Sequence, residues 1–288
     1  MSDLVLKAAI YTKLPHPLFE PRRSVEATFD YLCQVVTRQR LEVSRSQEEV
    51  DGPDSFVHFL CSTIIEVVFA SGDITWQTVR GQFSRYCRSG GPTTFVNAYE
   101  CASWGYALRH MLLGRTTDVK NILITVLDAN IYNMKFWEYN SNWGNSGFGM
   151  TTFLIERSGS SAAENVFTGC STSSNAMQDF AFWVKKISSG NPEAVVVLPF
   201  FPSQISRGLS RILSGSSRLP DLHDQWGHCF GSDPWVSLIA ESVNPGFDKG
   251  RSYLLCSHAL NGYHVACKIN VAEDAELRFG EVKNDVSF

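Results

Sequence analysis

Short apolar runs alternate with segments of helical periodicity along almost the whole chain. The apolar runs, each of strand length, are residues 4–11, 63–70, 94–99, 119–127, 150–155, 194–199, 251–257 and 263–270. Helical periodicity marks residues 24–40, 74–87, 177–187, 203–213 and 234–242, and a further helix begins near Cys101. This alternation predicts an α/β fold with a largely parallel sheet and helices on its faces.

The order of strands and helices is similar in the two halves of the chain, although we find no strong residue-level repeat. The small, polar stretch 158–174 is the best candidate for a boundary. We therefore predict an N-terminal half, residues 1–160, and a C-terminal half, residues 161–288. Another polar stretch, residues 41–54, predicts a surface loop or a frayed helix.

Composition and charge exclude several classes of protein. The 288 residues contain no uninterrupted apolar stretch of about 18 residues, the length of a membrane span. A formal net charge of −4 gives no electrostatic reason to expect nucleic-acid binding. The N-terminus shows no secretory signal pattern. The eight cysteines are scattered without metal-like spacing, which favours reduced thiols, no metal site and a cytoplasmic location.

Cys101 lies where a strand-like run turns into a helix. Residues 94–99 are mainly β-branched and aromatic, whereas the residues after Cys101 are small and then helix-periodic. A thiol at this point feels the positive end of the helix dipole, which favours the nucleophilic thiolate. The alternative is a structural cysteine packed at the end of a strand.

Four motifs in series resemble those of the thiolase superfamily, most nearly its β-ketoacyl-acyl carrier protein synthase III branch. The nucleophile pattern of that family, A-C-A-G/S-x-x-Y-A-L, is similar to C-A-S-W-G-Y-A-L at residues 101–108. Residues 120–128 resemble the strand K-x-x-L-V-V-x-x-D, and residues 144–149 resemble an altered G-D-G-A-G-A turn. Residues 249–255 resemble the strand entry before the oxyanion loop.

The resemblance covers most of the chain from about residue 63, and it implies a thiolase-like fold. Two similar α/β halves would pack as a layered αβαβα core. The N-terminal half would carry the nucleophile Cys101, and the C-terminal half would carry His228 and the oxyanion loop.

The family pairs its cysteine with a histidine in P-H-Q-A-N and an asparagine in G-N-x-x-A-A-S. Residues 199–206, P-F-F-P-S-Q-I-S, contain no histidine, whereas residues 227–234, G-H-C-F-G-S-D-P, place His228 at the asparagine position. The resemblance therefore implies an unusual Cys101/His228 dyad. Losing one donor costs decarboxylative condensation about a hundredfold or more in rate. Acyl transfer, with His228 as the base, is easier to retain.

Further residues receive roles from the same resemblance. Residues 257–262 fall where the family has its oxyanion loop and where thiolases carry a second catalytic cysteine. His258 is therefore a secondary catalytic candidate, with a structural histidine as the alternative. Asn261 and Gly262 are candidates for oxyanion or substrate contacts. The backbone N–H of Cys101 and one from the turn 260–262 would form the oxyanion hole.

One helix, residues 203–213, carries three weaker candidates. Ser203 is a candidate contact for the acyl intermediate, although we favour a plain helix N-cap for it. Arg207 and Arg211 lie four residues apart and resemble the basic residues with which the family meets phosphopantetheine or its acidic carrier protein. Exposed arginines of a helix are the alternative.

An aromatic segment lies between the strands 119–127 and 150–155. Its rings predict an acyl tunnel, a dimer contact or, more simply for most of them, core packing. They are Tyr132, Phe136, Trp137, Tyr139 and Trp143.

Together these features predict an acyltransferase or condensing enzyme. It would load an acyl group from an acyl-CoA or acyl-carrier-protein thioester onto Cys101 and pass it to an acceptor in a specialised fatty-acid or polyketide-type pathway, without a further cofactor. We expect a homodimer, or a heterodimer with another ketosynthase-like chain, paired through residues 94–99. A catalytically degenerate partner of an active ketosynthase is the main alternative. An ordinary thiolase would need a second cysteine where His258 stands.

Overall fold

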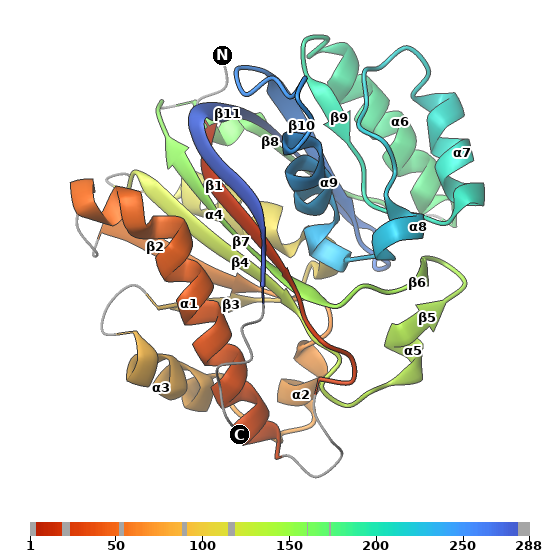
Figure 1. Ribbon diagram of the computed structural model, residues 1–288. Helices are drawn as coiled ribbons and strands as arrows, with labels where there is room; N and C mark the ends of the chain where they lie inside the picture. Colours follow the sequence, from red (N-terminus) through yellow and green to blue (C-terminus); the bar gives the residue numbers. More distant parts are fainter. Residues whose placement is uncertain are drawn as a thin grey trace.

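A nine-stranded sheet forms the centre of the protein (Figure 1). The computed structural model describes residues 4–18, 24–51, 55–87, 91–114, 119–159, 161–172 and 174–281. Its strands are β1 (Leu4–Lys13), β2 (Phe56–Cys61), β3 (Thr94–Val96), β4 (Asn121–Asp128), β5 (Tyr139–Asn140), β6 (Gly144–Asn145), β7 (Gly149–Arg157), β8 (Val166–Cys170), β9 (Val195–Val197), β10 (Ser252–His258) and β11 (Tyr263–Gly280). The order in the sheet is β3-β2-β4-β7-β1-β11-β10-β9, β8 also pairs with β11, and β5 and β6 form a separate two-stranded sheet.

The helices lie between these strands in the sequence. They are α1 (Val25–Asp51), α2 (Glu66–Ala70), α3 (Trp76–Tyr86), α4 (Ser103–Leu113), α5 (Lys135–Glu138), α6 (Ala176–Ser189), α7 (Ser203–Ile212), α8 (His223–Trp226) and α9 (Asp233–Ser242). Short 3-10 turns include η2 (Glu100–Ala102), η3 (Ala162–Asn165) and η4 (Phe230–Ser232).

The sheet is mixed, so the prediction of a largely parallel sheet is wrong. β2 pairs in parallel with β3 and β4, β1 with β11, and β9 with β10. The pairs β4–β7, β7–β1, β10–β11 and β8–β11 are antiparallel. β11 follows β10 through a tight turn, and only a parallel pair requires a long crossover connection.

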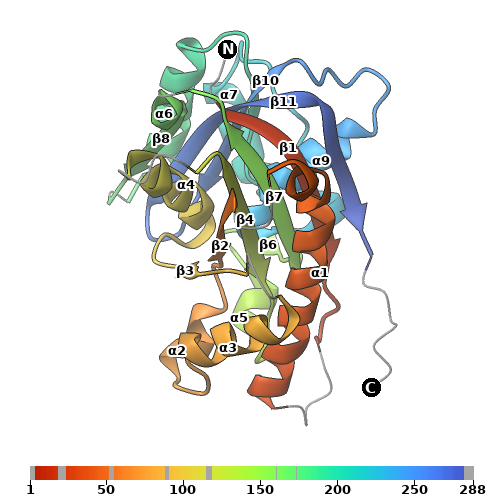
Figure 2. The same ribbon diagram turned by 90° about the vertical axis from the view of Figure 1, so that its left-hand side faces the viewer.

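The helices cover the sheet in three groups, as Figures 1 and 2 show. α1 and α3 share one buried cluster with residues of β2, β4 and β7, and α6 and α7 share another with residues of β9 and β10. α4 and α9 share the largest cluster with strands of both halves. α4 and α9 therefore form the middle layer, with one part of the sheet and α1 and α3 on one side, and the other part of the sheet and α6 and α7 on the other. This is the αβαβα order of layers that the resemblance implied.

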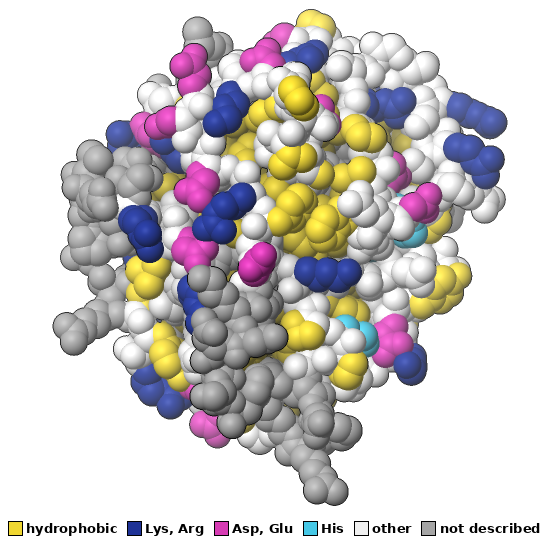
Figure 3. Space-filling model, in the orientation of Figure 1, with side chains coloured by type: hydrophobic (Ala, Val, Ile, Leu, Met, Phe, Trp, Pro, Cys, Tyr) yellow, Lys and Arg dark blue, Asp and Glu magenta, His cyan; other side chains and the backbone are white. Residues whose placement is uncertain are grey.

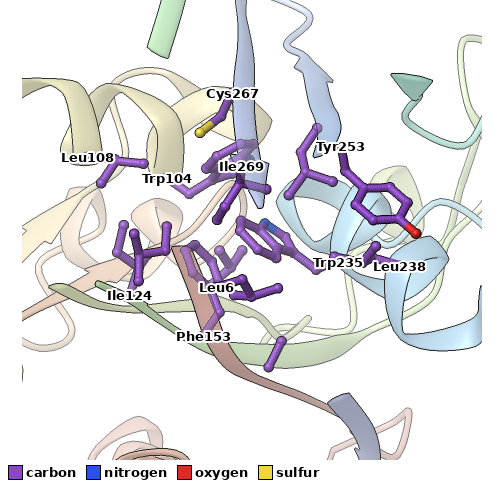
Figure 4. Packing of buried hydrophobic residues seen from close by; sticks show 14 of the residues in the cluster. Leu6, Trp104, Leu108, Ile124, Phe153, Trp235, Leu238, Tyr253, Cys267 and Ile269 are labelled. Carbon is purple, nitrogen blue, oxygen red and sulfur yellow. The ribbon is translucent and has the colours of Figure 1, made fainter. Parts of the chain in front are cut away.

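The largest core cluster holds α4 in place against the rest of the protein (Figure 4). The Trp235 ring stacks on Phe153 with 3.6 Å between centroids and meets Trp104 edge-on at 5.1 Å. A Cβ on Gly105 would lie 2.2 Å from a methyl of Val265, so only glycine allows α4 to approach β11 this closely. This packing positions Cys101, which lies two residues before the start of α4.

Three segments differ from their predicted structure. Residues 63–70 do not form a strand, because the strand is β2 and α2 follows it. A buried apolar run has no periodicity that separates a strand from a short buried helix. The polar stretch 41–54 continues α1 as far as Asp51, and residues 52–54 lie outside the described residues. The stretch 158–174 contains η3 and β8, which pairs with β11, while the division at residue 160 stays a prediction.

The surface carries charges of both signs. Figure 3 shows hydrophobic side chains gathered over α9 and β11 at the middle of one face, with basic and acidic side chains interspersed around them. Within the described part of the chain, every helix is too short or too polar to span a bilayer.

Candidate active site

Cys101 lies in η2, buried at the end of the β3 segment and directly before α4. Two neighbouring residues have left-handed backbone conformations, Glu100 with φ 45° and Phe230 with φ 54°. Such conformations are costly for residues other than glycine and are concentrated at functional sites. A Cβ on Gly231 would lie 3.2 Å from the Cys101 carbonyl oxygen, so η4 packs tightly against η2.

A chain of three buried side chains runs from Cys101 to Asp233. His228 Nε2 lies 3.8 Å from Cys101 Sγ, and His228 Nδ1 lies 2.7 Å from Asp233 Oδ2. Asp233 also accepts the backbone N–H groups of Phe200, at 2.9 Å, and of Cys229, at 2.5 Å. With Asp233 Oδ2 this close to Nδ1, the tautomer that carries its proton on Nδ1 is favoured, which leaves the Nε2 lone pair facing the thiol. The structure thus brings together the predicted pair and adds Asp233.

Asp233 was missed by the sequence analysis, although the His228 motif includes it. Its signal is positional, since it begins α9, is followed by Pro234 and lies five residues after His228. A proline at the second position indicates the start of a helix. η4 between the two residues turns the chain back, so that the carboxylate reaches the imidazole.

The electrostatic environment of Cys101 opposes ionisation of its thiol. Burial raises the pKa of Cys101 well above its ordinary value, and the Asp128 carboxylate raises it further. The Thr63 hydroxyl, which donates to Sγ at 3.6 Å, acts in the opposite direction. The expectation that the helix dipole favours a thiolate is therefore wrong for this state, because α4 begins only at Ser103 and the loss of water dominates. The thiol needs a base.

Asp128 lies at the end of β4, beneath the turn that carries Thr63. Its Oδ1 accepts the Thr63 N–H at 2.7 Å, the Ser62 hydroxyl at 3.1 Å and the Ile64 N–H at 3.3 Å. Burial raises the pKa of Asp128 to about 6, although these donors oppose the shift. At neutral pH this carboxyl is mostly ionised and repels a developing thiolate.

We predict that Asp128→Asn makes the Cys101 thiol more reactive. The substitution removes a negative charge that raises the pKa of Cys101 and keeps an Oδ1 acceptor for the three donors. A lower pKa increases the thiolate fraction at any pH below it, so alkylation by iodoacetamide should become several-fold faster at pH 8, on the order of one pKa unit of relief. Peptide mass mapping measures the rate at Cys101.

Cys170 is the internal control for this alkylation experiment, because it is an exposed free cysteine. Its alkylation rate should be the same in both proteins. Unchanged or slower alkylation of Cys101 in the variant would show that Asp128 does not control its ionisation.

A cavity of about 430 Å³ opens beside Cys101 and His228. Much of its wall is apolar, with Trp137, Trp143, Met177, Phe201, Ile205 and Phe230 among the lining residues. Of the aromatic segment, Trp137 and Trp143 line this cavity, as a tunnel would require, whereas Phe136 and Tyr139 are exposed. Trp143 is also buried in the core, and Trp137 and Tyr132 pack against buried clusters, so core packing accounts for three of the five rings.

His258 lines the same cavity and keeps an unpartnered Nδ1 within the described structure. Its ring stacks on Phe180, with 4.9 Å between centroids. Burial, with a smaller effect of the neighbouring His264, lowers the pKa of His258 to about 4, so the ring is uncharged at neutral pH. His258 therefore adds a neutral polar group to the cavity wall.

The predicted oxyanion turn is already engaged within the protein. The Asn261 N–H donates to Glu100 Oε2 at 3.3 Å, and the Gly262 N–H donates to the Ala259 carbonyl oxygen at 3.0 Å. The Asn261 side chain donates to the Ala98 carbonyl oxygen at 3.2 Å. The predicted oxyanion hole combines the Cys101 N–H with one N–H of the turn 260–262, and in this state neither the Asn261 N–H nor the Gly262 N–H is free to be that donor.

The three candidates on α7 lie outside the cavity wall. Ser203 is exposed and follows Pro202, which occupies the N-cap position, so the capping role favoured from the sequence is wrong. Arg207 and Arg211 are exposed on the same helix, and Arg207 Nε donates to the Ser203 carbonyl oxygen at 3.2 Å. Ile205 of this helix does reach the cavity.

No known protein-family model matches the sequence, and no curated protein matches it. Solved structures do match. The acyltransferase ChlB3 superposes with a TM-score of 0.63 at 12% identity, over 96% of this chain and 99% of that protein. The 3-oxoacyl-(acyl carrier protein) synthase III of Pseudomonas aeruginosa PAO1 gives 0.59 at 9% identity, over 94% and 98%. A type II polyketide ketosynthase in complex with its acyl carrier protein gives 0.57 at 10% identity, over 86% and 84%.

The chain has the thiolase fold of these ketosynthases. The match extends over nearly the full length of the synthase III structure. Within this fold, Cys101 and His228, which are 127 residues apart in the chain, meet at the cavity.

Proposed function

We propose that this protein is an acyltransferase that works through a covalent acyl group on Cys101. The donor is a thioester of coenzyme A or of an acyl carrier protein, and the acceptor is a hydroxyl or an amine. The observation that carries the proposal is the buried contact chain from the Cys101 thiol through His228 to Asp233 at the wall of an apolar cavity.

The proposed reaction has two half-reactions. In the first, His228 Nε2 takes the thiol proton while Sγ attacks the thioester carbonyl, and the donor thiol leaves with that proton. In the second, His228 takes a proton from the acceptor, which attacks the acyl-enzyme and releases Cys101 as the thiol. Asp233 holds the imidazole and stabilises its positive charge in both steps.

Asp233 also favours acyl transfer over decarboxylative condensation. Condensation needs side chains that donate hydrogen bonds to the thioester oxygen, whereas a neutral His228 with its Nδ1–H on Asp233 presents an acceptor at Nε2. The segment 199–206, which lacks the family's histidine, contributes Phe201 and Ile205 to the cavity instead. Phe201 stacks near His228, with 6.4 Å between ring centroids, and adds no donor.

The structural neighbours support a thioester donor of this kind. One of them is a ketosynthase in complex with its acyl carrier protein, and another is an acyltransferase. We propose that a specialised biosynthetic pathway supplies the donor, and that the chain dimerises through β3, the edge strand of the sheet. The contact chain at Cys101 argues against a degenerate partner subunit, which would need no oriented base.

Intact-mass spectrometry tests the proposal. The protein is incubated with a panel of acyl-CoA thioesters, and a mass increase equal to one acyl group is expected from at least one donor. Cys101→Ala should gain no mass. Hydroxylamine, as a probe amine, should then return the acylated protein to its original mass. No adduct from any CoA or carrier-protein donor, or the same adduct on Cys101→Ala, would overturn the proposal.

A further inference from the structure

Glu100 places a carboxylate at the wall of the Cys101 cavity. The residue directly precedes Cys101 and is half-buried, with a left-handed backbone at φ 45°. Its Oε2 accepts the Asn261 N–H at 3.3 Å. Burial raises the pKa of Glu100 above its ordinary value, and hydrogen bonds from the backbone N–H groups of Asn261 and Leu260 limit this rise.

No cation balances this carboxylate inside the cavity, since no Lys or Arg occurs among the described residues that line it. His258 is uncharged at neutral pH because burial lowers its pKa to about 4. Both ring nitrogens of His228 face other residues, Nε2 facing Cys101 Sγ and Nδ1 facing Asp233 Oδ2. Two further carboxylates, Asp128 and Asp233, also act on the thiol, as their influence on the pKa of Cys101 shows.

The donors that a second carboxylate would need are occupied. Backbone N–H groups are good ligands for an anion, but Asn261 and Leu260 already bind Glu100. A carboxylate carried into the cavity by an acyl group would lose its water, face Glu100 and find no positive partner. An uncharged acyl group would instead bury apolar surface against rings such as Trp137 and Phe230.

We propose that this cavity accepts uncharged acyl groups and rejects acyl groups that carry a carboxylate, such as malonyl or succinyl, and that Glu100 sets this specificity. The inference rests on the proposed acyl transfer to Cys101. It also limits the reaction that supplies the donor. That reaction must produce a thioester of an uncharged acyl group rather than a thioester of a dicarboxylic acid that keeps one free carboxylate.

A pair of donors matched in size isolates the charge. Succinyl-CoA and succinamoyl-CoA differ only in a terminal carboxylate against a carboxamide. Succinamoyl-CoA should acylate Cys101 of the wild-type protein at least about tenfold faster than succinyl-CoA does. A ratio of about tenfold corresponds to the repulsion of one pair of like charges in a partly screened site. Glu100→Gln keeps the shape and the acceptor oxygen, and it should bring the ratio of the two rates close to one by accelerating succinyl transfer.

Glu164→Gln is the matched control, because Glu164 is an exposed acid of η3 outside the cavity wall. It should keep the wild-type ratio. Equal rates for the two donors in the wild-type protein would overturn the inference and leave acyl transfer standing, and so would an unchanged ratio in folded Glu100→Gln. Acylation by neither donor nor by the wider panel would overturn the proposed function itself. If Glu100→Gln fails to fold, the wild-type comparison decides.

Discussion

Replacing Asp233 by asparagine is expected to slow acyl transfer through Cys101 by about a thousandfold to ten-thousandfold. The amide of the introduced asparagine can donate to His228 Nδ1 where the carboxylate now accepts from it. The imidazole would then carry its proton on Nε2, which faces Cys101, and could no longer take the thiol proton. The rate of the mass increase, followed by quenched-flow mass spectrometry with the donor that acylates the wild-type protein, measures the effect.

Asp128→Asn is the matched control for this variant. It also neutralises a fully buried acid that acts on the Cys101 thiol, but Asp128 binds the turn at Thr63 rather than the imidazole. Acylation should not be slowed in the control. Asp233 also holds two backbone N–H groups, so thermal unfolding of both variants shows whether folding is affected. A folded Asp233→Asn with near wild-type acylation would remove Asp233 from the mechanism.

Replacing His228 by alanine is expected to slow acylation about a hundredfold to ten-thousandfold, the usual contribution of a positioned base. The effect should depend on pH. Burial raises the pKa of Cys101 well above its ordinary value, so without a base only the small thiolate fraction reacts. That fraction grows tenfold per pH unit below the pKa. The acylation rate of the variant should therefore rise steeply between pH 7 and pH 9, whereas the wild-type rate should rise less.

His110→Ala is the comparison for this experiment, because His110 is an exposed histidine of α4 with no contact to the cavity. Its acylation rate and pH profile should match those of the wild-type protein. Added imidazole should partly restore acylation in His228→Ala, since the lost ring leaves space beside the thiol. A flat pH profile together with rapid acylation in His228→Ala would rule out the proposed base.

The two site residues that lie in recognisable short motifs could be predicted from the sequence. Cys101 stands out because a β-branched run changes to helical periodicity at that residue, and His228 stands out within a glycine-flanked motif. Glu100 lies outside the quoted motifs, and Asp128 and Asp233 lie within them without any sign of a role, because an acid at the start or the end of an element is common. Their roles depend on contacts that only the folded chain shows: 2.7 Å from Asp233 to His228 within one turn of chain, 2.7 Å from Asp128 to the Thr63 N–H, and 3.3 Å from Glu100 to the Asn261 N–H.

The sequence by itself determined most of the succession of strands and helices, because burial imposes a period on each element that the order of apolar residues reveals. The αβαβα class came from the resemblance of four motifs to those of a known family. Only the tertiary structure decided the mixed sheet, the helical state of residues 66–70 and the ionisation of Cys101. Strand direction depends on how connections run between elements, and a thiol's pKa depends on the water and charges around it. Both are set by residues that are distant in the chain and adjacent only after folding.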